Sequence, residues 1–351
     1  MPEPRFLALR LGSLGDIVHT FPAVSALRAT FPAAEIVWLT HPRYKLLVES
    51  SSLASEIWTV DTRSLSSLRE AIGRIHHATW DAAIDYQGLW KSAALPFLAG
   101  VKRRIGFSSQ TVREFGVPLL YTDQVNASTA HIAEQNGELS VRAGARQLVA
   151  PIALRVLPED QAAVRAELRA LAIDRYVVLS PGGGWHSKCW PADRFGLLCR
   201  KITSALGLRC VVNYGPGEHP LANSVRANSG DANPLLYDAG LGQLMALLRG
   251  AVCVVGGDTG PLHLAVALGT PVVALFGPTD PARNGPYHGV PRSPSAGKPS
   301  QFTTRSGEDI VLRAPHTVTT YTRSDQTHPS MLAIDLDSVF DAVCRRVGVL
   351  G

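Results

Sequence analysis

The sequence predicts an α/β protein built from two doubly wound domains, each with a mostly parallel sheet covered by helices. Short apolar runs that end in glycine-containing turns alternate with stretches of helical periodicity, a pattern typical of βαβ units. The pattern starts afresh near residue 150, so each half of the 351 residues has the length of a domain. With 46% hydrophobic and 18% charged residues, a disordered chain is excluded.

The first forty residues predict one complete βαβ unit. The apolar run 5–12 indicates a strand, 13–16 a turn, and the apolar residues spaced helically within 17–31 a helix. A second strand follows at 35–40. Three more strands are predicted in this half, at 56–60, 81–88 and 103–107.

The second half repeats the alternation after an extended linker at 149–160. Helices are predicted at 159–171 and, from apolar residues at helical spacing, across 336–347 at the end of the chain. The segment 288–309 is polar and rich in Pro, Ser and Gly, which predicts a mobile loop. The predicted strands of this half are 176–184, 209–215, 251–260 and 271–277.

Positive charge is concentrated in one segment. The net charge is +5, and residues 62–113, with eight basic and three acidic residues, hold an excess of the same size. Such a cluster indicates binding to nucleic acid, an anionic membrane surface or an acidic substrate, unless it is simply a solvated face. The eight basic residues are Arg63, Arg69, Arg74, Lys91, Lys102, Arg103, Arg104 and Arg113.

Cysteine usage and hydropathy indicate a soluble protein of a reducing cytoplasm. The five cysteines have no CxxC spacing and none precedes Cys189, which argues against a disulfide framework and a structural zinc site. We expect them to be buried as small apolar side chains. The N-terminus lacks the pattern of a signal peptide. The apolar stretch 261–277 is interrupted by His263 and is shorter than the roughly 20 residues of a membrane span.

The segment 251–281 carries the sharpest chemical signal. A strand ends in two glycines, Asp258 or Thr259 follows as a helix N-cap, and Pro261 suits the first helical turn. The unpaired amides of such a helix start attract a diphosphate, and His263 on the same turn is placed to donate to it. A purely structural helix start is the alternative, weakened by a second turn of this kind at 277–281.

A matching turn at 11–16 ends with Asp16. Its GxxGD spacing differs from the GxGxxG of dinucleotide-binding proteins, and no acid closes the following strand, which disfavours a nicotinamide dehydrogenase. Asp16 is either a helix cap or, at a strand's carboxyl end, a general base. A third turn at 181–195 contains Lys188, a cation suited to a phosphate. Glu218 follows the strand 209–215 and is placed to accept sugar hydroxyls.

These segments together resemble the bacterial lipopolysaccharide heptosyltransferases of glycosyltransferase family nine, most of all the heptosyltransferase I branch. The resemblance spans most of the chain and is carried by an ordered set of motifs. They are LGSLGDIVHTFPAV at the N-terminus, DYQGLWKSA (85–93), HIAEQN (131–136), HSKCWP (186–191) and GGDTGPLHLAVALGTPVVALFGPTDP.

The resemblance implies the GT-B fold, in which two Rossmann-like domains face one another across a cleft. The acceptor-binding domain would then span 1–153 and the nucleotide-sugar-binding domain 154–330, with a helix in 331–351 packing back toward the first domain. It also implies an inverting transfer of heptose from ADP-heptose to a Kdo sugar of the lipid A inner core, without a bound metal or other cofactor.

The same resemblance assigns site residues. Asp16 matches the general base, and Lys188 and His263 are the other catalytic residues. The implied donor-binding residues are Ser13, Gly15, Ser187, Lys188, Glu218, Asp258, Thr259, Gly260 and His263. The implied acceptor-binding residues are Arg63, Gln87, Lys91, Arg113 and His131.

The implied partners are a nucleotide sugar and a Kdo-lipid A acceptor, which the basic segment 62–113 would attract, and no nucleic acid. The protein would work in the cytoplasm, peripherally at the inner face of the inner membrane. Two alternatives stay open: a family-nine transferase with another donor or surface polysaccharide, and a nucleotide-binding protein without transfer activity. The chain departs from the family pattern after residue 282: the loop 288–330 is long, and near its end His316 and His328 stand where family members often have cysteines. These departures bear on the sugar and the acceptor rather than on the fold.

Overall fold

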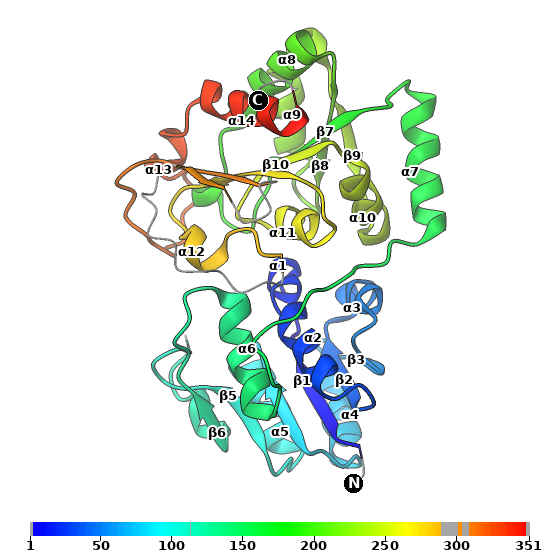
Figure 1. Ribbon diagram of the computed structural model, residues 1–351, viewed down its shortest axis with the longest axis vertical. Helices are drawn as coiled ribbons and strands as arrows, with labels where there is room; N and C mark the ends of the chain where they lie inside the picture. The colour runs from blue at the N-terminus through cyan, green and yellow to red at the C-terminus, as the bar shows by residue number, and fades with distance from the viewer. Residues whose placement is uncertain (1–2, 113, 289–300, 304–308, 349–351) are drawn as a thin grey trace. The chain divides into compact units, whose positions relative to one another are not determined.

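The computed structural model describes residues 3–112, 114–288, 301–303 and 309–348. The chain divides into two compact units. The first comprises Met1–Arg155 and Tyr287–Pro291, and the second Val156–Pro286 and Arg292–Gly351. The main division thus lies two residues after the boundary expected from the sequence. Figure 1 shows both units as sheets covered by helices.

The first unit is built on a parallel six-stranded sheet in the order β3-β2-β1-β4-β5-β6. The chain runs outward from β1 to one edge and then returns to β4, so the strand order reverses between β1 and β4. Ligands of doubly wound sheets bind at such a switch point, beyond the carboxyl ends of the strands. The strands are β1 (Arg5–Leu9), β2 (Glu35–Thr40), β3 (Glu56–Thr59), β4 (Ala82–Asp85), β5 (Arg104–Phe107) and β6 (Asp123–Val125).

The helix predicted within 17–31 is two helices. The first ends at Val18 and the second begins at Phe21, with Pro22 in its first turn. Proline has no N–H to donate to the carbonyl of Val18, so a continuous helix would lose a hydrogen bond there. The helices of this unit are α1 (Leu14–Val18), α2 (Phe21–Thr30), α3 (Lys45–Ser51), α4 (Leu65–His76), α5 (Trp90–Leu98) and α6 (Ile132–Ala143), with 3₁₀ turns η1 (Pro42–Tyr44) and η2 (Val117–Leu120).

The second unit repeats the same strand order. Its parallel strands run β13-β11-β10-β7-β8-β9, and β12 pairs antiparallel with β13 at the edge. The switch point therefore lies between β7 and β10. Most of the predicted loop at 288–309 lies outside the described residues. The strands are β7 (Tyr176–Ser180), β8 (Arg209–Tyr214), β9 (Leu235–Asp238), β10 (Cys253–Gly257), β11 (Val272–Phe276), β12 (Gln301–Thr303) and β13 (Ile310–Arg313).

The final helix, α14, belongs to the second unit. It packs on α8 and on β10, β11 and β13, and Val339, Ala342 and Val343 are part of the second unit's core. Helical spacing predicts an apolar stripe, but it does not say which domain covers it. The helices are α7 (Pro158–Ala170), α8 (Ala192–Leu206), α9 (His219–Ala227), α10 (Leu241–Gly250), α11 (Gly260–Ala267), α12 (Pro281–Asn284), α13 (Pro329–Leu332) and α14 (Leu336–Val347), with 3₁₀ turns η3 (His186–Lys188) and η4 (Gly230–Ala232).

The central strands are buried on both faces, as parallel strands covered by helices are. In β7, β10 and β11 every residue is buried. All five cysteines are buried, which confirms the expectation that they pack as small apolar side chains. A search of the described residues finds no helix with the length and apolar character of a membrane span.

Candidate active site

The loop after β1 fixes the side chain of Asp16. Nη2 of Arg10 lies 2.8 Å from Oδ1 of Asp16, and both the backbone N–H and the hydroxyl of Ser13 donate to Oδ2, at 3.0 and 2.9 Å. The Asp16 side chain is nevertheless 41% exposed. Its carboxylate is thus held in one orientation and remains open to a substrate. Ser13, predicted to bind the donor, is engaged by Asp16, and Gly15 is buried in α1.

Gln87 holds this loop from the neighbouring strand. Its Oε1 accepts hydrogen bonds from the backbone N–H groups of Leu11, at 2.9 Å, and Gly12, at 3.3 Å. The backbone N–H of Gln87 in turn donates to the buried Asp85 at the end of β4, at 2.9 Å. A Cβ on Gly12 would lie 2.7 Å from the ring of Tyr44, so this position requires glycine. The two loops at the switch point are therefore one hydrogen-bonded structure.

Arg10 and Asp85 are site residues that the sequence analysis missed. Arg10 is buried, and besides Asp16 it donates to the carbonyl of Tyr86. Asp85 also accepts hydrogen bonds from Ser92 (2.9 Å) and Tyr121 (2.8 Å). Burial raises the pKa of Asp85, although its hydrogen bonds act in the opposite direction. A charged residue closing a run of buried apolar ones is the signal that would have marked both positions.

The predicted acceptor-binding residues have different surroundings in the first unit. Arg63 is exposed after β3, and Lys91 is exposed on α5. His131 is the N-cap of α6; it is buried and stacked on Tyr287, with ring centroids 4.4 Å apart. Arg113 lies outside the described residues. The side chain of Gln87 contacts the Asp16 loop.

Several positive charges of segment 62–113 make contacts within the first unit. Arg103 pairs with Asp123 at 3.1 Å, Arg74 lies over the ring of Trp58, and Arg104 donates to two backbone carbonyls. These arginines are committed to the fold of the unit. Within the described residues, five of the segment's cations are exposed and make no ion pair: Arg63, Arg69, Arg74, Lys91 and Lys102.

The second unit brings Lys188, Asp258 and His263 together at its own switch point. Nζ of Lys188 lies 3.5 Å from Oδ2 of Asp258, and Nε2 of His263 lies 2.9 Å from Oδ1. Lys188 belongs to η3, after β7, and also lies over the ring of Trp185. Asp258 follows β10, and His263 is in the first turns of α11. Residues from the two adjacent strands β7 and β10 thus form one charged cluster.

Asp258 is the anion of this cluster. Burial by itself would raise its pKa, but the charge of Lys188 and the hydrogen bond and charge of His263 outweigh that effect and lower the pKa to about 2. The carboxylate is therefore ionised at neutral pH, and it holds the side chains of Lys188 and His263 beside the start of α11. The site keeps positive charge and amide donors together, as a diphosphate requires.

Glu218 lies against the glycine turn after β7. Its Oε2 accepts the N–H of Gly215 at 2.8 Å, and a Cβ on Gly182 would lie 2.3 Å from its Oε1. On the other side of the turn, a Cβ on Gly183 would lie 3.1 Å from the methyl group of Thr259. The turn is thus enclosed between the ends of β8 and β10, and glycine is needed for this close approach.

The other predicted donor residues have distinct surroundings. Gly260 begins α11, and the buried hydroxyl of Thr259 has no hydrogen-bond partner within the part of the chain that the structure describes. Ser187 is buried; its backbone N–H donates to the carbonyl of Ser324 at 3.1 Å and its hydroxyl to that of Thr322 at 3.5 Å. Ser187 therefore anchors the 322–328 segment to η3.

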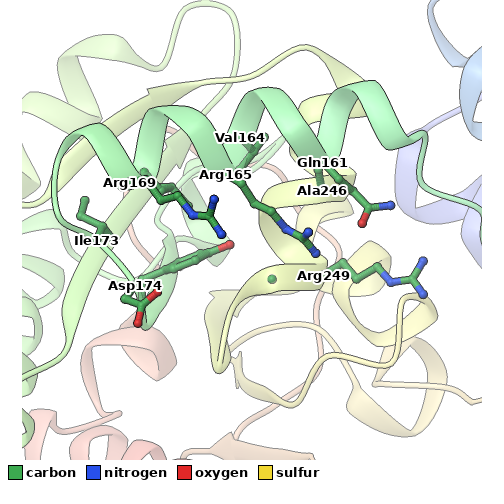
Figure 2. A pocket seen from close by; sticks show the side chains of 11 residues that line it. Gln161, Val164, Arg165, Arg169, Ile173, Asp174, Ala246 and Arg249 are labelled. Carbon is green, nitrogen blue, oxygen red and sulfur yellow. The ribbon is translucent and has the colours of Figure 1, made fainter.

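A separate cavity of about 360 Å³ lies between α7 and α10 (Figure 2). Arg165, Arg169 and Arg249 are on its rim, and Tyr176, the first residue of β7, is in its wall. It is therefore at the amino end of β7, whereas Lys188 and Asp258 follow the carboxyl ends of their strands. Doubly wound sheets bind their ligands at the carboxyl ends, so this cavity is not the candidate site.

Taken together, the two units define a class of enzyme. Each has the Rossmann strand order, one presents an oriented carboxylate, and the other presents a lysine and a helix start suited to a diphosphate. This is the arrangement of a glycosyltransferase with the GT-B fold, which uses a nucleotide sugar. Over the residues described, no group of three or more His, Cys, Asp or Glu side chains is placed to hold a metal ion.

Comparison with known proteins gives the family. Residues 68–297 match the model of Glycosyltransferase family 9 (heptosyltransferase), and the chain belongs to this family. It is 28% identical over 299 residues to lipopolysaccharide heptosyltransferase 1 of Salmonella typhimurium, covering 81% of this chain and 91% of that protein.

Solved structures show the same fold over the whole length. A family 9 glycosyltransferase from Veillonella parvula aligns with a TM-score of 0.81 at 20% identity, covering 99% of this chain and 98% of that one. An E. coli heptosyltransferase solved with ADP aligns with a TM-score of 0.73 at 24% identity, covering 97% and 99%. The GT-B fold predicted from the sequence is thereby confirmed.

Proposed function

We propose that this enzyme transfers heptose from ADP-heptose to a Kdo sugar of the lipopolysaccharide inner core, with inversion at the anomeric carbon and without a bound metal. The observation that carries the proposal is the cluster of Lys188, Asp258 and His263 beside the glycine turn of the second unit. The similarity to lipopolysaccharide heptosyltransferase 1 supports the sugar and the pathway, and the E. coli structure with ADP supports the nucleotide.

The second unit is proposed to bind the donor. The amides at the start of α11 and the turn 182–184 would face the diphosphate, and Lys188 would neutralise part of its charge. The hydroxyl of Thr259, which has no hydrogen-bond partner among the described residues, can donate to a phosphate oxygen, and Glu218 can accept from the ribose hydroxyls. As the bond from the sugar to ADP breaks, negative charge grows on the leaving phosphate, and these fixed donors stabilise it in place of a metal ion.

The first unit is proposed to supply the base. Asp16 takes the proton of the acceptor hydroxyl while that oxygen forms its bond to the anomeric carbon and ADP departs with the bonding electrons. A direct displacement of this kind inverts the anomeric centre. Arg10 and Ser13 keep the carboxylate oriented before the substrates arrive, so little orientational entropy is lost in the reacting complex.

The acceptor is proposed to be the anionic Kdo-lipid A, reached from the cytoplasmic side of the inner membrane. Kdo carries a carboxylate and lipid A carries phosphates, so exposed cations of the first unit would attract them. Lys91 and Arg63 are two such cations in the described part of the chain. Gln87 is proposed to act beside Asp16, whose loop it holds.

The test is a screen of donors and acceptors with the purified protein. Calorimetric titration with ADP-heptose, GDP-sugars and UDP-sugars should give measurable affinity for the ADP-sugar alone. Transfer to Kdo-lipid A should persist in excess EDTA, and the product should have the opposite anomeric configuration to the donor. Transfer from another nucleotide sugar only, or loss of transfer in EDTA that Mg²⁺ or Fe²⁺ restores, would contradict the proposal.

A further inference from the structure

The first unit exposes several large apolar side chains close together. Trp90, Phe97 and Leu98 on α5 are exposed, and so are Phe115, at 99%, and Leu119, at 81%. Single exposed hydrophobic residues are ordinary, but a contiguous group of this size marks an interaction surface. We call these five residues the α5 patch; α5 is labelled in Figure 1.

The patch is one surface because both ends of α5 are tied to the segment 115–120. At the first end, Nε1 of Trp90 donates to the carbonyl of Phe115 at 3.2 Å. At the other, Arg104 lies over the ring of Phe97, 5.3 Å from its centroid, and donates to the carbonyl of Leu120 at 2.7 Å. The buried side of the helix, with Ser92, Ala93 and Leu95, faces the core, so the exposed residues share the outer side.

Two lysines flank the patch, beside one carboxylate. Lys91 follows Trp90 and Lys102 follows the end of α5, and both are exposed without an ion pair to any described residue. The neighbouring carboxylate of Glu114 is engaged by the backbone N–H of Trp90 at 2.7 Å. An apolar surface with a tryptophan and flanking lysines matches the boundary of an anionic bilayer, where rings enter the headgroup region and ammonium groups meet lipid phosphates.

From this arrangement we infer that the α5 patch docks the enzyme on the surface of an anionic phospholipid bilayer. A second copy of the chain fits the patch less well, because a twofold contact would place like-charged lysines on both sides of one small apolar area. The inference deepens the proposed function and rests on it for its purpose, since a membrane-embedded acceptor requires the first unit to reach the bilayer. Helix α5 begins three residues after Gln87, which holds the Asp16 loop.

Vesicle sedimentation tests the inference without donor or acceptor. The protein should bind vesicles of phosphatidylcholine with about a third phosphatidylglycerol more tightly than phosphatidylcholine alone, and salt should weaken the binding. Phe115→Ser with Leu119→Ser should reduce the affinity at least tenfold, because these side chains would bury the most apolar area in the lipid. Val318→Ser, an exposed apolar residue of the second unit, is the matched control and should not change it.

The charged part of the patch has its own test. Replacing Lys91 and Lys102 by Gln should weaken binding to the anionic vesicles about fivefold for each lysine, while binding to phosphatidylcholine alone stays the same. The fold of every variant is checked by thermal unfolding, which these exposed positions should leave unchanged.

Two activity assays separate this inference from the proposed function. The Phe115→Ser, Leu119→Ser variant should lose transfer to an acceptor embedded in vesicles and keep transfer to a water-soluble Kdo acceptor. If the enzyme binds vesicles but uses a different donor, the proposed function is contradicted and the docking surface is not. Absence of vesicle binding by the wild type, equal binding by the double variant, or a wild-type dimer that the double variant dissociates would overturn the docking surface.

Discussion

Nη2 of the buried Arg10 lies 2.8 Å from Oδ1 of Asp16, and this contact joins the end of β1 to the first turn of α1. The second oxygen of the carboxylate is held by Ser13. A side chain fixed on both oxygens loses little freedom when a substrate binds. Its partly exposed position leaves it accessible to an acceptor hydroxyl, which is the combination a general base needs.

Replacing Asp16 by Asn should abolish most turnover and leave donor binding intact. The amide has the size of the carboxylate but cannot take a proton, so kcat should fall by about 10²–10⁴. The ADP affinity, measured by calorimetry, should not change, because Lys188 and the start of α11 belong to the second unit. Asp341→Asn, at an exposed position on α14, is the control. An Asp16→Asn enzyme with near-normal turnover would show that the base is another group.

Arg10→Lys tests whether Arg10 acts through Asp16. Lysine keeps the charge, but it cannot contact Asp16 and the carbonyl of Tyr86 with two separate nitrogens as Arg10 does. The kcat should therefore fall about ten- to a hundredfold with the donor KM unchanged. In the Asp16→Asn background Arg10→Lys should lower kcat almost no further, because both substitutions disrupt the same interaction between Arg10 and Asp16.

The control is Arg5→Lys. Arg5 is at the first end of β1, whereas Arg10 follows its last residue, and Arg5 forms an ion pair of 2.8 Å with Glu35 on β2. This substitution should affect stability slightly and turnover not at all. An equal loss of kcat from Arg10→Lys with and without Asp16 would mean that Arg10 contributes independently of the base.

Residues near one another in the chain could be predicted as a site, and residues that meet across the sheet could not. Asp258 and His263 are five positions apart around one helix start, so cap chemistry and helical spacing placed both beside the same turn. Arg10 and Tyr86, by contrast, are separated by 76 positions. Their contact depends on β4 returning beside β1, which no local pattern encodes.

The fold shows the same division. Strands with apolar runs were predicted, because burial on both faces leaves a clear trace in the sequence. Strand β6, whose residues Asp123–Val125 are at most half-buried, carries no such trace and was missed. The final helix was recognised from its periodicity, but its packing on α8 could not be predicted, since several faces could cover the same apolar stripe.

Gly182→Ala should weaken donor binding without unfolding the protein. The new methyl group would meet Oε1 of Glu218 at 2.3 Å, and the flexible carboxylate would move aside. Loss of the hydrogen bond between Glu218 and a ribose hydroxyl, about 1.5–3 kcal/mol, should raise the Kd for ADP about ten- to a hundredfold.

Gly184→Ala is a matched control in the same turn, because a Cβ there meets nothing within 4 Å. Its ADP affinity should equal that of the wild type, and both variants should melt at similar temperatures. If the Gly182→Ala and Gly184→Ala variants bind ADP with equal affinity, and Glu218→Gln also leaves this affinity unchanged, Glu218 does not bind the donor.

The buried cluster of the second unit should make stability depend on pH in acid. The pKa of Asp258 is lowered to about 2 from its ordinary 3.8, so the folded state binds this proton less readily than the unfolded state. The resulting stabilisation, about 2 kcal/mol, is fully present above the unfolded pKa and disappears as the pH falls through about 2. The free energies of unfolding of the wild type and of Asp258→Asn, measured with denaturant, should therefore differ most above about pH 5 and converge near pH 2.

At neutral pH the variant also leaves Lys188 without its counter-charge, which adds to the loss. Asp341→Asn, which removes an exposed carboxylate, should show no such pH-dependent difference, and a gap between wild type and Asp258→Asn that stays constant across this range would contradict an ionised, paired Asp258.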